Sequence, residues 1–266
     1  MYYLTVDQLT IVLQRLDTLV NKVIDKINLR TNSFPIEYIS LMSCFLLHNL
    51  SSAKTLLRIF ESFGTDWFPV TVGYTITRPM FEIDVTAHYI SQSPLVRSQQ
   101  YIDFKYVLDF KKMQNVKKHR ASSHITWKEA MNLYWNDVYD QNEQKIISKF
   151  EDVRSRFTYH STKSKNKLFK NWAGISLKEI ALAVNHEEAY DVFYGDLSSF
   201  THADVSLADR FLKSDDLGLK WSVQAEEGEV GCVIRYAVTF LDCFLRLFGK
   251  QFSTWQESEV DLCWQF

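Results

Sequence analysis

The sequence has 266 residues, of which 46% are hydrophobic and 23% charged, as in an ordinary globular protein. A formal net charge of −2 excludes nucleic-acid binding through overall charge and leaves that role to a local basic patch. With only 8 Gly and 4 Pro, the chain is not a turn-rich all-β protein. The amino terminus has no basic stretch followed by an apolar one, and no apolar run approaches about 20 residues, so we predict a cytoplasmic protein without signal peptide or membrane contact.

Hydrophobic residues at three- and four-residue spacing predict helices over residues 5–29 and 36–62. A third helix should end near residue 91. Its first part, residues 70–77, is rich in Val, Thr and Tyr, which favour strand locally. Pro79 either kinks this helix or marks its first turn. A fourth helix over 95–118 ends in a run of basic residues.

The second half is also predicted to be helical, around one loop. A long helix runs from 127 to about 157, and the basic, least periodic stretch 159–171 forms the loop. The remaining predicted elements are a short helix to about 184, a helix over 186–202, a short helix over 203–213, a loop over 214–228 with extended pieces around 219–223, and a strongly apolar helix over 230–248.

Together these elements predict an all-α fold. We expect a single helical bundle of about seven main helices over residues 1–266, with a core of about 36–248 and a C-terminal tail of 249–266. Aromatic residues make up 15% of the chain, and because bundles with aromatic-rich outer faces often dimerise, a homodimer is one expected assembly.

The cysteines and histidines give no metal pattern. The four cysteines are scattered without a Cys-x-x-Cys pair, and we predict reduced core residues at positions 44, 232, 243 and 263. His186 begins an incomplete His-Glu-x-x-His, and His88 has no obvious partner. The sequence therefore predicts no metal ligands and no cofactor.

The most unusual pattern lies in the helix predicted over 186–202. Four polar side chains follow one another there at four-residue spacing: Tyr190, Tyr194, Ser198 and His202. Side chains at this spacing share one face of a helix. These groups can be satisfied within the core, or they can line a polar cavity in which His202 acts as a general base or an anion ligand.

Arg78 and Glu82 form a second pattern, because their four-residue spacing places them on one helix face among apolar side chains. One interpretation is a structural or surface ion pair. The other is that Arg78 points into a polar pocket and Glu82 orients it.

A third pattern is Arg154 followed by His160 after five intervening residues. It loosely matches the ribonuclease signature of the HEPN superfamily, in which the arginine stabilises phosphorane charge and the histidine moves a proton without a metal. The alternative is a basic helix end, which interacts favourably with the helix dipole.

With these residues, the chain resembles a functionally uncharacterised bacterial family of all-helical proteins. That family carries an Arg-x-x-x-Glu helix, a Trp, a Tyr-x-x-x-Tyr and a Ser-x-x-x-His. The corresponding residues, within about 40–245, are Arg78, Glu82, Trp172, Tyr190, Tyr194, Ser198 and His202, while Pro79 departs from the pattern. The resemblance implies that these helices meet in one polar centre, and that the protein is similar to accessory or effector proteins of mobile and defence loci.

The first functional hypothesis is an effector or toxin-like protein of a bacterial defence or mobile-element locus. It would be a HEPN-like, metal-independent ribonuclease or a nucleotide-acting enzyme. The expected catalytic residues are His202, Arg78, Glu82, Tyr194 and Ser198, with Arg154 and His160 as the alternative pair; RNA or nucleotide would be bound by Tyr190, Lys163, Lys165 and Lys167.

The second hypothesis is a non-enzymatic helical sensor or interaction protein. The Arg, Glu, Tyr and His cluster would then be a structural hydrogen-bond network that fixes the helix register. A partner protein of the same locus would bind an exposed aromatic face near Trp255 and Trp264.

Overall fold

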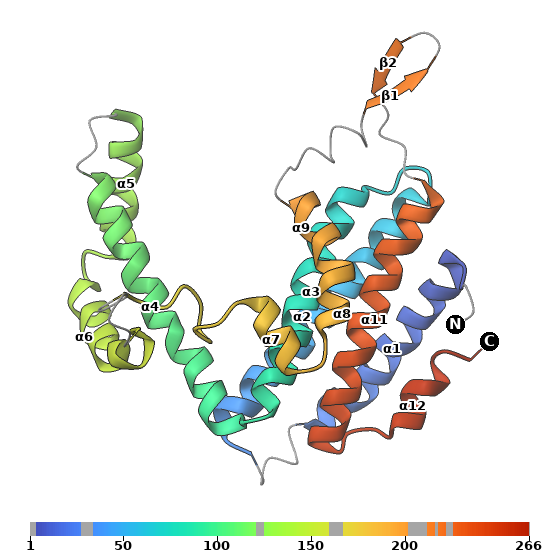
Figure 1. The fold of residues 1–266 in the computed structure, drawn as a ribbon, viewed down its shortest axis with the longest axis horizontal. Helices are drawn as coiled ribbons and strands as arrows, with labels where there is room; N and C mark the ends of the chain where they lie inside the picture. Colours follow the sequence, from blue (N-terminus) through green and yellow to red (C-terminus); the bar gives the residue numbers. More distant parts are fainter. Residues whose placement is uncertain are drawn as a thin grey trace. The chain divides into compact units, whose positions relative to one another are not determined.

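The computed structural model describes residues 4–27, 34–120, 125–159, 167–201, 212–215, 218–221 and 226–265. Over these residues the fold is helical (Figure 1), which confirms the predicted all-α class. The described helices of at least 12 residues are α1 (Val6–Ile27), α2 (Ile36–Phe63), α3 (Val70–Ser91), α4 (Pro94–Arg120), α5 (Ile125–Val138), α6 (Glu143–Arg154) and α11 (Glu227–Phe252).

The shorter elements lie in the second half of the chain. They are the 3-10 turn η1 (Ser155–Phe157), the helices α7 (Leu177–Ala183), α8 (Glu187–Ala189), α9 (Gly195–Thr201) and α12 (Glu257–Leu262), and the π-helical turn η2 (Tyr190–Tyr194). Strands β1 (Leu212–Asp215) and β2 (Gly218–Trp221) form an antiparallel hairpin in which Leu212 pairs with Trp221.

Close approaches between Cα atoms divide the chain into two compact units. We call Met1–Pro94 together with Leu177–Phe266 the terminal unit, and Leu95–Ser176 the middle unit. A single domain over residues 1–266 stays a prediction. The buried core includes residues of α1, and Trp255 and Val260 near the C-terminus, all outside the expected core range of 36–248.

The terminal unit is built on four long helices. Helices α1, α2, α3 and α11 lie side by side, and α3 packs most extensively on α11 (Figure 1). Their contact faces are fully buried at Val12, Leu16, Phe81, Phe244 and Phe248. The wide apolar face of α11 explains this arrangement, because an apolar face of that width is stable only when neighbouring helices cover it.

Helix α3 begins in the stretch that favours strand locally. Packing explains the helix: a Cβ atom on Gly73 would lie 2.7 Å from Val233 Cγ1 and 2.8 Å from Phe68 Cε1. The missing side chain therefore lets α3 approach α11 closely, and this tertiary contact outweighs the β propensity of residues 70–77. Pro79 lies inside the helix and does not mark its start.

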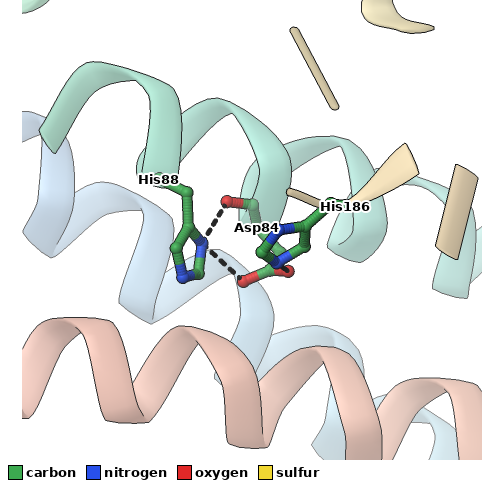
Figure 2. Close-up of side chains that lie close together, drawn as sticks. All are labelled: Asp84, His88 and His186. Atoms are coloured by element: carbon green, nitrogen blue, oxygen red, sulfur yellow. Dashed lines mark hydrogen bonds and ion pairs between the residues drawn. The ribbon is translucent and has the colours of Figure 1, made fainter. Parts of the chain in front are cut away.

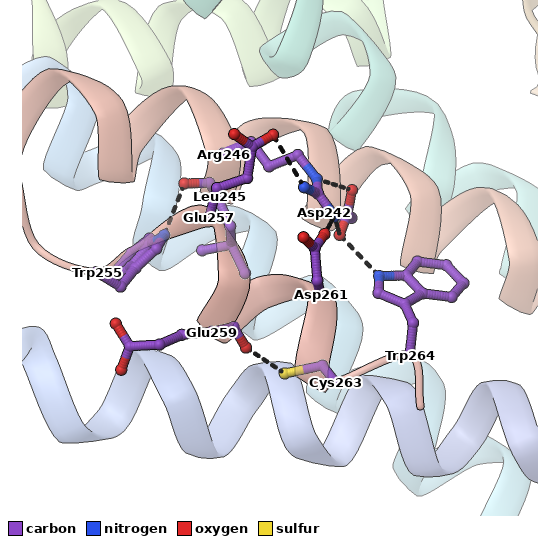
Figure 3. Close-up of polar contacts among 9 residues, drawn as sticks. All are labelled: Asp242, Leu245, Arg246, Trp255, Glu257, Glu259, Asp261, Cys263 and Trp264. Atoms are coloured by element: carbon purple, nitrogen blue, oxygen red, sulfur yellow. Dashed lines mark hydrogen bonds and ion pairs between the residues drawn. The ribbon is translucent and has the colours of Figure 1, made fainter. Parts of the chain in front are cut away.

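The C-terminal segment folds back onto α1 and α11 (Figure 3). Trp255 is 6% exposed and donates from Nε1 to the Leu245 carbonyl oxygen at 3.0 Å. Trp264 donates from Nε1 to Asp242 Oδ1 at 2.8 Å, and Arg246 binds Asp242 at 2.8 Å. The predicted exposed aromatic face is wrong at Trp255, which is buried, whereas Trp264 is half-buried; both indole N–H groups donate within the chain.

In the middle unit, the predicted helix over 127–157 is wrong at its centre. The chain turns at 139–142 and separates α5 from α6. Trp135 and Tyr139 pack with one group of α4 residues that includes Met113, whereas Phe150 packs with another that includes Phe104. Ile146 and Ile147 of α6 also pack against the first cluster, so α5 and α6 share it, and α6 with η1 covers the second.

The predicted loop 159–171 is tied at its ends. The Tyr159 N–H donates to the Lys167 carbonyl oxygen at 2.9 Å, and the Phe169 N–H donates to the Phe157 carbonyl oxygen at 2.8 Å. Residues 160–166 lie outside the described residues.

The cysteine prediction is partly wrong. All four cysteines are free, but Cys44 and Cys232 are exposed, whereas Cys243 is half-buried and Cys263 is buried. No helix in the described part of the chain has the length and apolar character needed to cross a bilayer.

Candidate functional site

Ionisable and aromatic side chains line the contact between α3 and residues 177–201 of the terminal unit. We call this contact the polar seam. It contains one cluster of Arg78, Glu82 and Tyr194, and a second of Asp84, His88 and His186.

The first cluster joins α3 to η2. Arg78 donates from Nε to Glu82 Oε1 and from Nη2 to the Tyr194 hydroxyl, both at 2.9 Å. The Tyr194 hydroxyl donates to Glu82 Oε1 at 3.5 Å, and Arg78 Cζ lies 5.2 Å from the Tyr194 ring centroid. The Arg78 side chain is 17% exposed and the Glu82 side chain 41%, so the cluster is open to solvent at Glu82.

Two tyrosines form a stacked pair beside Arg78. The rings of Tyr190 and Tyr194 are 4.7 Å apart at an angle of 18°, and their centroids lie 6.4 and 5.9 Å from that of Phe81. The helix predicted over 186–202 contains the π-helical turn η2 at these residues. Such turns are rare and occur frequently at functional sites.

The electrostatics of this cluster favour a fixed cation beside a neutral phenol. Burial raises the pKa of Tyr194, and the negative charge of Glu82 raises it further. Burial acts to lower the pKa of Arg78, but its interactions with Glu82 and Tyr194 raise that pKa on balance. Two such donors can bind an anion or stabilise negative charge that develops in a reaction.

Figure 2 shows the second cluster, in which Asp84 lies between two imidazoles. The Asp84 side chain is 2% exposed; His88 Nδ1 lies 3.2 Å from its Oδ1, and His186 Nε2 lies 3.4 Å from its Oδ2. One ligand atom from each residue lies within 4.8 Å of the others. Nitrogen and oxygen groups of this kind can hold a metal ion.

The charges in this cluster are mutually dependent. Burial acts to raise the pKa of Asp84, but His186 and His88 lower it on balance, while the interaction with Asp84 raises the pKa of His186. Burial, together with the charge of Asp84, raises the pKa of Cys243 on α11 to about 12. Asp84 therefore stays charged, and the nearby thiol stays protonated.

The turn after α7 positions His186. Asn185 has a positive φ of 61°, and its N–H donates to the Leu182 carbonyl oxygen at 3.2 Å. The His186 N–H donates to the Ala181 carbonyl oxygen at 2.8 Å, which completes a Schellman motif. His186 Nδ1 also lies 2.8 Å from the Val184 carbonyl oxygen, so the ring is fixed with Nε2 toward Asp84.

The structure brings together some of the predicted site residues. Arg78, Glu82 and Tyr194 are in direct contact, Tyr190 packs beside them, and Ser198 is half-buried on α9. The predicted base His202 lies outside the described residues. The catalytic roles stay predictions.

The other predicted residues belong to the middle unit. Trp172 packs there on Tyr101 at 5.1 Å, and Lys167 is exposed. Arg154 is half-exposed and pairs with Glu151 at 3.2 Å on the surface of α6. The remaining predicted residues, His160, Lys163 and Lys165, lie outside the described residues.

Sequence reasoning missed the Asp84, His88 and His186 cluster. The four-residue spacing of Asp84 and His88 on one helix was a usable signal. No local pattern places His186 beside them, because it comes from a turn about 100 residues later.

A further candidate region is a hollow of about 360 Å³ in the middle unit. Its described lining includes four lysines and two half-buried tyrosines, with Asp109 as an acidic member: Lys105, Lys112, Lys145, Lys149, Tyr106 and Tyr134. Lys112 Nζ lies 5.2 Å from the Tyr134 ring centroid, and Lys149 Nζ lies 6.0 Å from that of Tyr106. A hydrogen bond to Tyr134 raises the pKa of Lys112, so this lysine stays charged.

Charge is distributed unequally between the two units. The middle unit contains 16 Lys and Arg against 8 Asp and Glu, a formal charge of +8. The terminal unit contains 14 against 24, a formal charge of −10. The formal net charge of −2 is therefore the sum of a basic middle unit and an acidic terminal unit.

A family model described as "Family of unknown function (DUF5677)" matches residues 45–219. The chain belongs to DUF5677. The DUF5677 match includes both clusters of the polar seam and the whole middle unit, but not α1 or α11. No curated protein and no solved structure matches the chain. The resemblance to an all-helical family of unknown function is confirmed, whereas the HEPN-like relation stays a prediction.

Proposed function

We propose that the protein binds single-stranded RNA through the lysine and tyrosine hollow of the middle unit and acts on it as an effector ribonuclease. The observation that carries this proposal is the hollow itself, in a unit of formal charge +8. Its lysines offer charges to phosphates, and its half-buried tyrosines offer faces on which bases stack. A role in a defence or mobile-element locus and a cytoplasmic location belong to the same proposal.

RNA affinity should depend on the lysines of this hollow. The double substitution Lys112→Ala and Lys149→Ala is expected to weaken binding of a fluorescent oligouridine about 25-fold at about 0.1 M salt, since two phosphate contacts are lost. The slope of log affinity against log salt should fall by about 1.4. Fluorescence anisotropy over a salt series measures both quantities.

The matched control removes two lysines of the terminal unit, Lys54→Ala with Lys250→Ala, and should leave both quantities unchanged. Equal losses in the two double variants, or no binding by the wild-type chain at low salt, would contradict the proposal.

For the chemical step, we place the reaction at the Arg78 and Tyr194 cluster. Arg78 is a fixed cation beside a neutral hydroxyl, which suits the charge that develops on a phosphodiester. Arg154 is a less suitable candidate, because it is half-exposed and paired with Glu151 on the surface.

Removal of one hydroxyl tests this placement. Tyr194→Phe keeps the ring stack on Tyr190 but removes the hydrogen bonds with Arg78 and Glu82. Cleavage of a labelled RNA is expected to fall at least about 100-fold, while the unfolding free energy falls by about 0.5–1.5 kcal/mol. Single-turnover cleavage and urea denaturation of the same preparation separate the two effects.

One observation favours the second candidate function, a non-enzymatic interaction protein. Arg78 already has Glu82 and Tyr194 as partners, as expected of a network that fixes helix register. A clear loss of stability in Tyr194→Phe, with RNA cleavage per folded molecule unchanged, would favour this alternative over the ribonuclease.

A further inference from the structure

We propose that Asp84, His88 and His186 form a binding site for a divalent transition-metal ion of the zinc class. The ligands are an Asp84 carboxylate oxygen and one ring nitrogen from each histidine. This inference is independent of the proposed RNA function, because it concerns a different cluster and a different ligand.

The distances fit such an ion. Zinc binds nitrogen and oxygen ligands at about 2.0–2.2 Å, which separates neighbouring ligands of a tetrahedral site by roughly 3.3 Å. The observed separations are 3.2 Å from Asp84 Oδ1 to His88 Nδ1 and 3.4 Å from Asp84 Oδ2 to His186 Nε2. His88 Nδ1 also lies 2.9 Å from the Asp84 backbone carbonyl oxygen, so His88 would bind the ion through Nε2, or through Nδ1 after giving up that contact. One ligand atom from each of the three side chains lies within 4.8 Å of the others, so small side-chain movements would bring all three to one ion.

The carboxylate also needs a cation. Asp84 is buried, and its Oδ1 accepts no hydrogen bond from any described group, although His88 lies nearby. A buried carboxylate oxygen that lacks a hydrogen bond is unfavourable unless the group is paired with positive charge or binds a metal. An ion between the three side chains would supply that charge.

The surroundings of His186 match those of a metal ligand. Its Nδ1 lies 2.8 Å from the Val184 carbonyl oxygen, so an N–H at Nδ1 donates to that oxygen and leaves the Nε2 lone pair toward Asp84 Oδ2. A lone pair and a carboxylate oxygen at 3.4 Å repel each other unless a proton or a metal ion lies between them. Metal-binding histidines generally donate their second N–H to a carbonyl or carboxylate in this way.

The ligand set selects the class of metal. Two imidazoles with one carboxylate suit Zn²⁺ and its neighbours, whereas Mg²⁺ and Ca²⁺ prefer oxygen ligands. The histidine side chains are 23% and 21% exposed, so solvent can reach the site. Three protein ligands with one position left for water is the pattern of a catalytic zinc site.

Metal binding by the full-length chain tests the proposal. Because exposed thiols also bind zinc, the parent protein carries Cys44→Ser and Cys232→Ser. After EDTA treatment, calorimetric titration with Zn²⁺ should give about one site per chain. Zn²⁺ at about 100 times its Kd should raise Tm by about 5–10 °C.

The variants His88→Gln and His186→Gln should each weaken Zn²⁺ binding at least about 10-fold, while the matched control His48→Gln, an exposed histidine outside the cluster, should bind as the parent does. Circular dichroism confirms that each variant is folded, and the two histidine variants keep the test valid if Asp84→Asn does not fold. Absence of the site in the parent, or equal binding by His186→Gln, overturns the proposal. None of these measurements involves RNA, so their outcome does not depend on the proposed RNA function.

Discussion

The substitution Phe81→Ala is expected to lower the free energy of unfolding by about 3–5 kcal/mol. Phe81 is fully buried on α3, and its ring lies 5.2 Å from that of Phe240 on α11. It also supports the stacked pair of Tyr190 and Tyr194. Truncation therefore leaves a cavity beneath the polar seam, and the tyrosines lose the surface on which they rest. Urea denaturation followed by circular dichroism measures the loss.

The control for this prediction is Phe63→Ala at the end of α2. Phe63 is 53% exposed, so its truncation should change the unfolding free energy by less than about 1 kcal/mol. If both phenylalanine substitutions destabilise the protein equally, Phe81 does not occupy the core position described here.

The substitution Gly73→Ala is expected to destabilise the protein by about 1–3 kcal/mol. Alanine in place of glycine normally stabilises a helix by about 1 kcal/mol, so the expected sign is opposite to the helix propensity. The reason is the close approach of α3 to α11, where a new methyl group would meet Val233 and Phe68. Thermal and urea denaturation both report the change.

Gly228→Ala is the matched control, because a Cβ atom there has no described neighbour within 4 Å. Gly228 lies in the first turn of α11, so its substitution by alanine should leave the free energy of unfolding unchanged or raise it slightly. A stabilising effect of Gly73→Ala would mean that the two helices are further apart than the structure places them.

The long helices were predictable because each carries an apolar face at helical spacing. Helices α2 and α11 are clear cases, with boundaries within a few residues of those expected. The turn at 139–142 was not predictable in this way. Residues on both sides continue the apolar period, and the turn depends on long-range packing. Helices α5 and α6 both contact the α4 cluster that contains Met113, and α6 also contacts the one that contains Phe104.

The two clusters of the polar seam differ in how much of them was predictable. Arg78 and Glu82 are four residues apart, so their pairing is local. Tyr194 is 116 residues from Arg78, and its contact with Arg78 was expected from the family resemblance alone. Asp84 and His88 are also local to one another, but His186 joins them through a turn after α7, and periodicity carries no information about where that turn lies.

The family match ends before α11 begins, although α11 covers the apolar face of α3. A fragment cut at residues 45 and 219 would keep Gly73 and Phe81 but lose Val233 and Phe240, which pack against them. The shared region therefore does not contain everything that its own helices need to stay buried. A chain shortened to this region would have to cover the same apolar face of α3 with another helix.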